Sequence, residues 1–401
     1  MNEAMDTGSI LSVNSGSSSL KLGYFVQQDL DEQAICEAII DGIGQSRGGL
    51  QIRNQAGEVV HSRQFESPTS VQSLQEVARW LGKNQNDVPV AVGHRVVHGG
   101  PRLTSHQAIT PQMLGELERA VHFAPLHIPT ALRLIREAEK VFPGIPQFAC
   151  FDTAFHRDLP EKAARFALPQ NFFQEGIRRY GFHGLSYESI LQLLGKNSPK
   201  RMVIAHLGNG ASLAAIQDSH CVDTTMGLTP TGGIPMSTRS GDLDPGVILY
   251  LLRNKSMNAD KVEALLNRHS GLAALSGGTA DMRDLKKLAE GGDAACRLAI
   301  EVFATAIRKT VAAFAAILGG LDLLVFTGGI GEHDPKLRAS VCAGLDFMGI
   351  SLNVQRNSRN DPVISVDGAV CEVRVMPSQE DLQIARHCRL LMSQSAGGQI
   401  A

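Results

Sequence analysis

The residues best suited to chemistry gather in a short polar turn near the start of the chain. Apolar residues on both sides predict two strands, and the turn between them contains Asn14, a glycine and serines that include Ser17 and Ser19. Lys21 adds a positive charge just beyond the turn. Because the backbone N–H groups and hydroxyls of such a turn form a concave set of donors, this composition is suited to holding phosphate oxygens. A plain serine-rich hairpin explains the same residues without any ligand.

Polar groups also follow several apolar strands further along the chain. Arg95, Asp152 and His206 each come at or just beyond the end of an apolar run. Helical patterns, such as those over 130–142 and 293–318, alternate with these strands, which predicts an α/β fold in layers. Because ligands of such sheets bind beyond the carboxyl ends of the strands, the polar groups mark a candidate active site. Five segments follow this plan: 88–95, 145–153, 202–210, 321–331 and 370–380.

A second hairpin pattern repeats the first. Residues 201–216 read as a strand, a turn of Gly, Asn and Ser, and a strand that begins Ser-Leu, like residues 10–25. The two copies lie about half the chain apart, and 401 residues is a length typical of two to three domains. The repeat therefore predicts two related domains that face each other across a cleft.

Composition excludes several classes of protein. With 38 Lys and Arg against 40 Asp and Glu, no overall field favours nucleic acid or an anionic membrane. The seven cysteines are scattered and form no Cys-x-x-Cys pair, which disfavours a disulfide scaffold or a zinc site. The most apolar stretch, 310–326, is broken by glycines and Asp322 and is too short to span a bilayer. Without a secretory signal in the first residues, we expect a cytoplasmic protein.

Motifs of other nucleotide-binding classes are missing from the sequence. Gly82-Lys83 and Gly195-Lys196 are each followed by Asn and lack the upstream glycine of a Walker A loop. Residues 156–159 imitate a protein-kinase catalytic loop without its partner motifs, and no Gly-x-Gly-x-x-Gly follows a strand. What remains, glycine turns with arginines, histidines and isolated acids, suits phosphoryl transfer, in which the protein positions groups and neutralises charge.

The chain resembles the acetokinase family in nine segments, which occur in family order over nearly its whole length. The resemblance implies two similar α/β domains of the actin/Hsp70/sugar-kinase (ribonuclease H-like) type around a central cleft. It also implies reversible phosphoryl transfer between ATP and acetate, Mg²⁺ with Mn²⁺ as a substitute, and a homodimer. We expect the domains to comprise 1–154 with 385–401 and 155–384. The matching segments are 14–21, 93–100, 124–127, 151–156, 180–184, 206–210, 236–245, 281–284 and 326–332.

The resemblance further assigns individual residues. It implies catalytic roles for Arg95, Asp152, His183 and Arg239, with an organising rather than a general-base role for Asp152, since a free carboxylate needs little proton abstraction. The implied Mg²⁺ ligands are Asn14 and Glu380. The implied acetate pocket is formed by Arg95, Val97, Leu126, His127, Phe182 and Pro230. The implied nucleotide contacts are Ser17, Ser19, Lys21, His206, Leu207, Gly208, Asn209, Gly210, Asp281, Met282, Arg283, Gly329, Ile330, Gly331, Glu332 and His333.

Several alternatives stay open at this point. The same chemistry on propionate or another short acid is the nearest one, and an ATP-dependent binding protein of the same superfamily is a different class. Arg95 could be a salt-bridged structural arginine, and Glu380 could be only a first-turn acid favoured by a helix dipole. The apolar pocket residues could be ordinary core, because most apolar side chains are simply buried.

Overall fold

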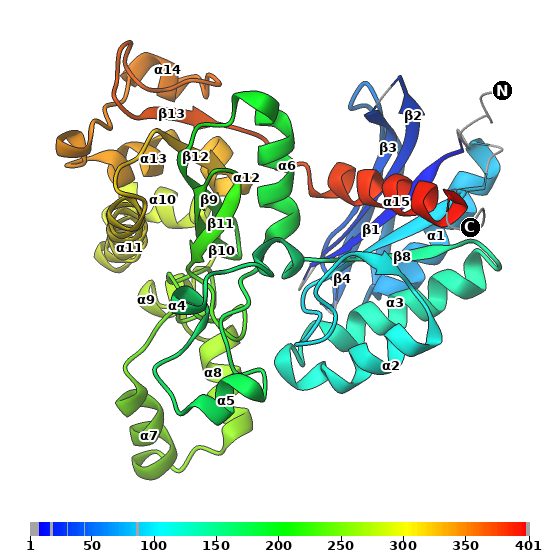
Figure 1. The fold of residues 1–401 in the computed structure, drawn as a ribbon, viewed down its shortest axis with the longest axis horizontal. Helices are drawn as coiled ribbons and strands as arrows, with labels where there is room; N and C mark the ends of the chain where they lie inside the picture. The colour runs from blue at the N-terminus through cyan, green and yellow to red at the C-terminus, as the bar shows by residue number, and fades with distance from the viewer. Residues whose placement is uncertain (1–7, 17–18, 30, 44, 86–87, 398–401) are drawn as a thin grey trace. The chain divides into compact units, whose positions relative to one another are not determined.

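The computed structural model describes residues 8–16, 19–29, 31–43, 45–85 and 88–397, which form two compact units (Figure 1). The first unit runs to Arg157 and resumes at Gln379, and the second unit comprises Asp158–Ser378. Each unit is built on one mixed sheet with helices, so the predicted α/β class is confirmed. The domains expected from the sequence, 1–154 with 385–401 and 155–384, remain a prediction.

The sheet of the first unit has eight strands in the order β5-β4-β3-β2-β1-β6-β8-β7. Strands β1 to β5 form an antiparallel meander, whereas β1, β6 and β8 run parallel and bring their carboxyl ends to one edge. The predicted hairpin at 10–25 is confirmed as β1 paired with β2. The strands are β1 Ile10–Ser15, β2 Leu20–Gln28, β3 Asp31–Ile40, β4 Arg47–Asn54, β5 Val59–Glu66, β6 Ala91–Val96, β7 Gln107–Ala108 and β8 Gln147–Phe151.

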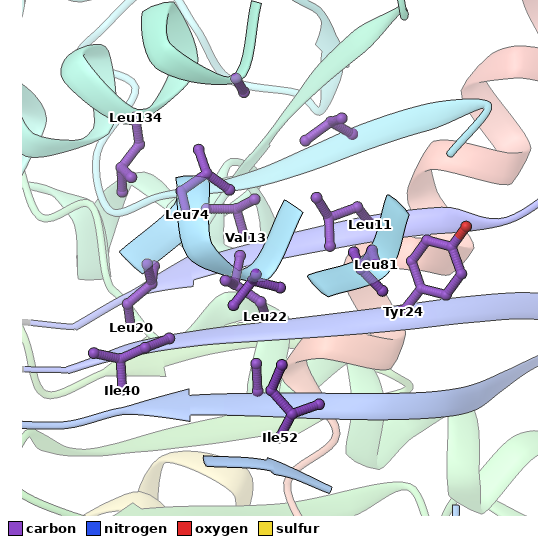
Figure 2. Close-up of a cluster of buried hydrophobic side chains, with 14 of the residues drawn as sticks. Leu11, Val13, Leu20, Leu22, Tyr24, Ile40, Ile52, Leu74, Leu81 and Leu134 are labelled. Carbon is purple, nitrogen blue, oxygen red and sulfur yellow. The ribbon is translucent and has the colours of Figure 1, made fainter. Parts of the chain in front are cut away.

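Helices cover both faces of this sheet. On one face, α1 (Ser70–Asn84) and α3 (Ile128–Val141) contact each other and bury a cluster that includes Leu11, Leu74 and Leu134 (Figure 2). On the other face, α15 (Glu380–Gly397) packs against β1 and β6 (Figure 1). A Cβ on Gly93 would lie 2.4 Å from Ile384 of α15, so β6 needs a glycine there. The neighbouring Val92 points to the other face and belongs to the buried cluster under α1 and α3, because successive side chains of a strand alternate between faces.

The second unit repeats the hairpin plan of the first. Its sheet has the order β11-β10-β9-β12-β13, with β9 antiparallel to β10 and parallel to β12. In the first unit β1 is likewise antiparallel to β2 and parallel to β6, so the internal repeat predicted from the sequence is confirmed in topology. The strands are β9 Arg201–Leu207, β10 Ala211–Gln217, β11 His220–Thr224, β12 Leu323–Thr327 and β13 Glu372–Val375.

The longest helix, α11 (Ala294–Leu318), confirms the pattern seen at 293–318. Asp293 caps its start and Gly319 ends it in the left-handed region at φ 69°. In the part of the chain that the structure describes, no helix is both long and apolar enough to cross a membrane. The other helices are α2 Pro111–Arg119, α4 Glu161–Ala164, α5 Gln170–Gln174, α6 Gly184–Leu194, α7 Pro245–Asn254, α8 Ala259–Arg268, α9 Gly271–Leu275, α10 Met282–Glu290, α12 Gly328–His333, α13 Pro335–Cys342 and α14 Val354–Ser358, with 3₁₀ turns η1 Val121–Phe123, η2 Ala154–His156, η3 Gly195–Asn197 and η4 Asp346–Met348.

Candidate active site

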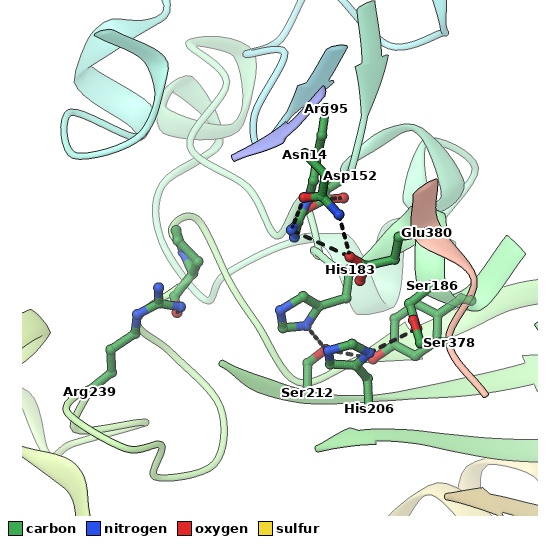
Figure 3. Close-up of polar contacts among 12 residues, drawn as sticks. Asn14, Arg95, Asp152, His183, Ser186, His206, Ser212, Arg239, Ser378 and Glu380 are labelled. Atoms are coloured by element: carbon green, nitrogen blue, oxygen red, sulfur yellow. Dashed lines mark hydrogen bonds and ion pairs between the residues drawn. The ribbon is translucent and has the colours of Figure 1, made fainter. Parts of the chain in front are cut away.

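Four polar side chains of the first unit meet beyond the parallel strands of its sheet (Figure 3). Asn14 lies in β1, Arg95 in β6, Asp152 directly after β8, and Glu380 begins α15. Arg95 Nη1 donates to Asn14 Oδ1 at 3.0 Å, and Asn14 Nδ2 donates to Glu380 Oε2 at 3.1 Å. The edge at which the carboxyl ends of parallel strands meet has therefore gathered a cation, two carboxylates and an amide.

Arg95 is fixed in this cluster by an ion pair. Its Nε donates to both carboxylate oxygens of Asp152, and its Nη2 donates to Oδ2 at 2.6 Å. Burial disfavours the charged guanidinium, but the charges of Asp152 and Glu380 outweigh that effect and raise the pKa of Arg95 above its usual value. Arg95 is therefore a permanent, oriented cation, and the salt-bridged interpretation describes its geometry correctly.

The same cluster offers oxygen ligands to a divalent cation. Next to Glu380, one carboxylate oxygen of Asp381 is buried and has no hydrogen-bond partner among the residues that the structure describes. Burial and the neighbouring charge of Glu380 raise the pKa of Asp381 to about 6. Carboxylate and amide oxygens are the donors that Mg²⁺ prefers, so these residues fit such an ion. Sequence analysis named Asn14 and Glu380 but missed Asp381, whose only signal is its place beside Glu380.

A pocket of about 440 Å³ adjoins this cluster within the first unit. Arg95, Val97, Leu126 and His127 all line it, so the structure brings together four of the predicted acetate-binding residues. Its wall also includes Ser15 and Gly16 of the polar turn after β1, and residues that the sequence did not suggest, which lie after β3, around the start of α1 and on α3. These additional lining residues are Ser15, Gly16, Ile43, Pro68, Thr69, Ser70, Val71, Thr130, Ala131, Arg133 and Leu134.

The remaining predicted residues of the first unit belong to the turn after β1. Ser17 lies outside the described residues. The carbonyl of Ser19 accepts the Gly16 N–H at 2.8 Å, which closes the turn. Lys21 is exposed and pairs with Asn14 across the β1–β2 hairpin. Phe182 and Pro230, predicted for the acetate pocket, belong to the second unit, where both are buried.

In the second unit, His183 and His206 form a stacked pair (Figure 3). Their ring centroids are 4.3 Å apart and their planes differ by 22°. His206 lies near the end of β9, and His183 precedes α6 in the left-handed region at φ 58°, an uncommon conformation for a residue other than glycine. The Nδ1 atom of each ring is 2.8 Å from a serine hydroxyl, that of Ser212 for His183 and that of Ser186 for His206.

Arg239 lies in the same unit, on a long loop before α7. Its Nη1 donates to the carbonyl of Pro230 at 3.2 Å. A Cβ on Gly210 would lie 3.2 Å from His183 Nε2 and 3.4 Å from Arg239 Nη1. The turn at 208–210, called the glycine turn below, therefore comes within van der Waals reach of both nitrogen groups. This arrangement gathers an imidazole and a guanidinium at one position, as a site for an anionic group requires.

The three predicted nucleotide segments are neighbours within the second unit. Gly328 and Gly331 of α12 lie against Leu207, which joins the segment 329–333 to the segment 206–210. Lys286 of α10 reaches Asp334, the residue after His333, at 2.8 Å, and so connects the segment 281–283 to the same place. Asp281 accepts the Arg283 N–H at the start of α10 and pairs with its side chain.

Comparisons with known proteins agree with this site. The acetokinase family model matches residues 9–386. An acetate kinase of Leifsonia xyli subsp. xyli is 40% identical over 94% of this chain and 97% of its own. Among solved structures, acetate kinase of Porphyromonas gingivalis has a TM-score of 0.84 at 34% identity, covering 96% of this chain and all of its own. A propionate kinase of Francisella tularensis subsp. tularensis has a TM-score of 0.86 at 33% identity, covering 95% and 98%.

The resemblance noted in nine sequence segments is therefore confirmed over the full length. The predicted fold class is confirmed in the same way, because two solved kinases superpose on nearly the whole chain. With a family model that covers almost every described residue and relatives above 30% identity, the chain belongs to the acetokinase family.

Proposed function

We propose that this chain transfers the γ-phosphoryl group of ATP reversibly to acetate, forming acetyl phosphate and ADP. The observation that carries the proposal is the pocket of the first unit, which is lined by the fixed Arg95 together with the apolar residues Val97 and Leu126. A guanidinium binds a carboxylate through two parallel hydrogen bonds, and a small apolar wall accepts the methyl group. The full-length likeness to acetate kinases supports the same substrate.

In the proposed reaction a carboxylate oxygen of acetate attacks the γ-phosphorus. A new P–O bond forms as the bond to the β–γ bridging oxygen breaks, and ADP leaves with that electron pair. Arg95 binds and orients the carboxylate, while His183 and Arg239 donate N–H groups to the equatorial oxygens of the phosphoryl group. Acetate is already ionised near neutral pH, so no base is needed, and Asp152 holds Arg95 in place.

The proposal includes a metal and a nucleotide site. Asn14, Glu380 and Asp381 would hold Mg²⁺, or Mn²⁺ in its place, and the ion would screen the charge of the phosphates. The segments 206–210, 281–283 and 329–333 would bind ATP or ADP. The homodimer implied by the resemblance and the cytoplasmic location expected from the first residues remain predictions.

A second candidate is the same transfer to a longer acid. The pocket volume of about 440 Å³ is several times that of a two-carbon acid, and one solved relative is a propionate kinase. One methylene in an apolar pocket changes selectivity by only about 1–3 kcal/mol, so we expect graded preferences among short acids.

Trapping the product as a hydroxamate tests the proposal. The protein is incubated with ATP, Mg²⁺, hydroxylamine and one acid at a time, from acetate to longer straight chains, and acyl hydroxamate is measured. We expect acetate to give product only when ATP is present. Nucleotide binding without hydroxamate from any acid would contradict the proposal and favour the ATP-dependent binding protein.

A further inference from the structure

The two stacked imidazoles of the second unit are each the end of a chain of hydroxyl groups (Figure 3). Ser212 Oγ lies 2.8 Å from His183 Nδ1 and 2.6 Å from the hydroxyl of Tyr187. In parallel, Ser378 Oγ donates to Ser186 Oγ at 3.1 Å, and Ser186 Oγ lies 2.8 Å from His206 Nδ1.

Each serine hydroxyl has one proton to give, which links the states of its two neighbours. A serine that accepts a hydrogen bond from the next hydroxyl still has its own proton, which it can donate to the imidazole Nδ1. Ser186 accepts from Ser378 and is therefore set to donate to His206. When Tyr187 donates to Ser212, the same holds for His183. A neutral imidazole that accepts at Nδ1 carries its only proton on Nε2.

The Nε2 atoms of both rings face the glycine turn. The Cβ position of Gly210 lies 3.2 Å from His183 Nε2, and that of Gly208 lies 3.8 Å from His206 Nε2. Arg239 Nη1 is within 3.4 Å of the same Cβ position of Gly210. Protons on Nε2 therefore make two further N–H donors beside the guanidinium, where a lone pair would instead repel an anionic group.

We propose that Tyr187 and Ser212, and in parallel Ser378 and Ser186, are positioning residues that keep His183 and His206 as neutral imidazoles with the proton on Nε2. This inference rests on the proposed role of His183 as a donor to the phosphoryl group. It also explains how two rings can stack at 4.3 Å, because two imidazolium charges at that distance would repel each other.

The burial and placement of these hydroxyl groups also agree with a role in orienting the two imidazoles. Ser212, Tyr187 and Ser186 are completely buried, so their hydroxyls are shielded from bulk solvent. Ser212 lies directly opposite His206 in the β9–β10 pairing, and Ser186 and Tyr187 follow His183 within the first turn of α6. One strand pair and one helix end thus hold both rings and both serines in fixed register.

The test reads the tautomer of His183 directly. Protein labelled with ¹⁵N-histidine is examined by NMR, and the His183 signals are assigned by their loss in His183→Gln. We expect the wild-type chain to show a protonated Nε2 and an unprotonated Nδ1 at His183. A wild-type signal with the proton on Nδ1 would overturn the inference.

Variants then test the hydroxyl chain. In Ser212→Ala we expect the His183 signal to move toward a mixture of tautomers and kcat to fall by about tenfold, with KM for ATP and acetate within about twofold. Tyr187→Phe removes only a hydroxyl from a buried ring and should move the signal in the same direction. Ser212→Thr keeps a hydroxyl and should restore the wild-type tautomer and most of kcat.

A matched control lies on the same helix. Ser189 is equally buried, but its hydroxyl donates to the carbonyl of Ser186 rather than to an imidazole. Ser189→Ala should therefore leave the His183 tautomer and kcat unchanged. A His183 signal that is the same in Ser212→Ala and in wild type would contradict the inference.

Failure of this inference is distinguishable from failure of the proposed function. A chain that forms acetyl phosphate but carries the His183 proton on Nδ1 refutes the positioning residues alone. A chain with the proton on Nε2 that phosphorylates no acid refutes the proposed function and leaves the hydroxyl chain intact.

Discussion

The carboxylate of Asp152 binds Arg95 through Nε and Nη2, and the closest contact, Nη2 to Oδ2, is 2.6 Å. Asp152 is completely buried, so this ion pair forms away from bulk water, where its geometry is held firmly. The third nitrogen, Nη1, is directed to Asn14 and lies 3.6 Å from Glu380. One buried acid thereby fixes a cation between the pocket and the group of oxygen ligands.

Arg95→Lys tests whether the forked guanidinium of Arg95, which binds Asp152 through two nitrogens, is needed. A lysine keeps the charge but cannot reproduce the paired donation of Nε and Nη2 to Asp152, so we expect kcat to fall about a hundred- to a thousandfold. KM for ATP should stay within about twofold in steady-state assays. Arg102→Lys is the control, because Arg102 is exposed and its ion pair is with Glu116, away from the Asp152 cluster. Near-normal turnover in Arg95→Lys would remove the fork from the mechanism.

The oxygen ligands should control the metal requirement. We expect Glu380→Ala and Asp381→Asn each to raise the Mg²⁺ concentration for half-maximal activity by at least about tenfold, because each removes a negatively charged oxygen donor. Titration of activity with Mg²⁺ measures this, and thermal melting checks the fold.

Asp31→Asn is a suitable control for these variants. Asp31 is an exposed acid at the start of β3, and it forms an ion pair with Arg386 of α15, the helix that also contains Glu380 and Asp381. Unchanged Mg²⁺ dependence together with a lowered melting temperature in Glu380→Ala would identify Glu380 as a helix-end acid only.

His94 should make stability depend on pH. Burial lowers the pKa of His94 from 6.5 to about 4, and its Nε2 is hydrogen-bonded to Gln147 at 2.7 Å. Between these pH values the unfolded chain binds a proton at this histidine that the folded chain does not. The contribution of neutral His94 to the free energy of unfolding is therefore fully present above pH 6.5 and is lost as the pH falls toward 4.

The loss should reach about 2 kcal/mol by about pH 5. Urea-unfolding midpoints from about pH 7 to about pH 5 measure it. In His94→Asn the curve should be flatter than in wild type. An equally steep curve in that variant would assign the effect to other groups.

Val97→Ala tests what limits the size of the acid. We expect kcat/KM for propionate relative to acetate to rise about tenfold, because the smaller side chain leaves room for one more methylene. Val88→Ala is the control, since Val88 is an exposed valine of the same unit. An unchanged ratio in Val97→Ala would show that Val97 does not limit the acyl group.

Much of the fold and part of the site could be predicted because the signals are local. The hairpins at 10–25 and 201–217, helix α3 and helix α11 follow from alternation, apolar spacing and caps within a few residues. The polar groups at strand ends were also visible locally, as polar residues directly after apolar runs. Their meeting at one site was predicted because parallel strands bring their carboxyl ends to one edge of the sheet.

What the sequence did not reveal depends on contacts between distant elements. The buried carboxylate oxygen of Asp381 lies on α15, which returns to pack against β1, more than 350 residues away in the sequence. Ser186 and Ser212 look like ordinary small residues until α6 and β10 bring them to the imidazoles. Histidine is enriched in the left-handed region, but such residues are still uncommon there, so residue type alone did not predict the conformation of His183. The extent of the pocket depends on the packing of α1 and α3.

The most direct test of the central claim follows an oxygen atom. Acetate labelled with ¹⁸O is incubated with ATP, Mg²⁺ and the protein, and the product is observed by ³¹P NMR. If an acetate oxygen attacks the γ-phosphorus, acetyl phosphate appears with the isotope shift of an ¹⁸O atom bound to phosphorus. Absence of acetyl phosphate, or a product whose phosphorus carries no ¹⁸O, would contradict the account.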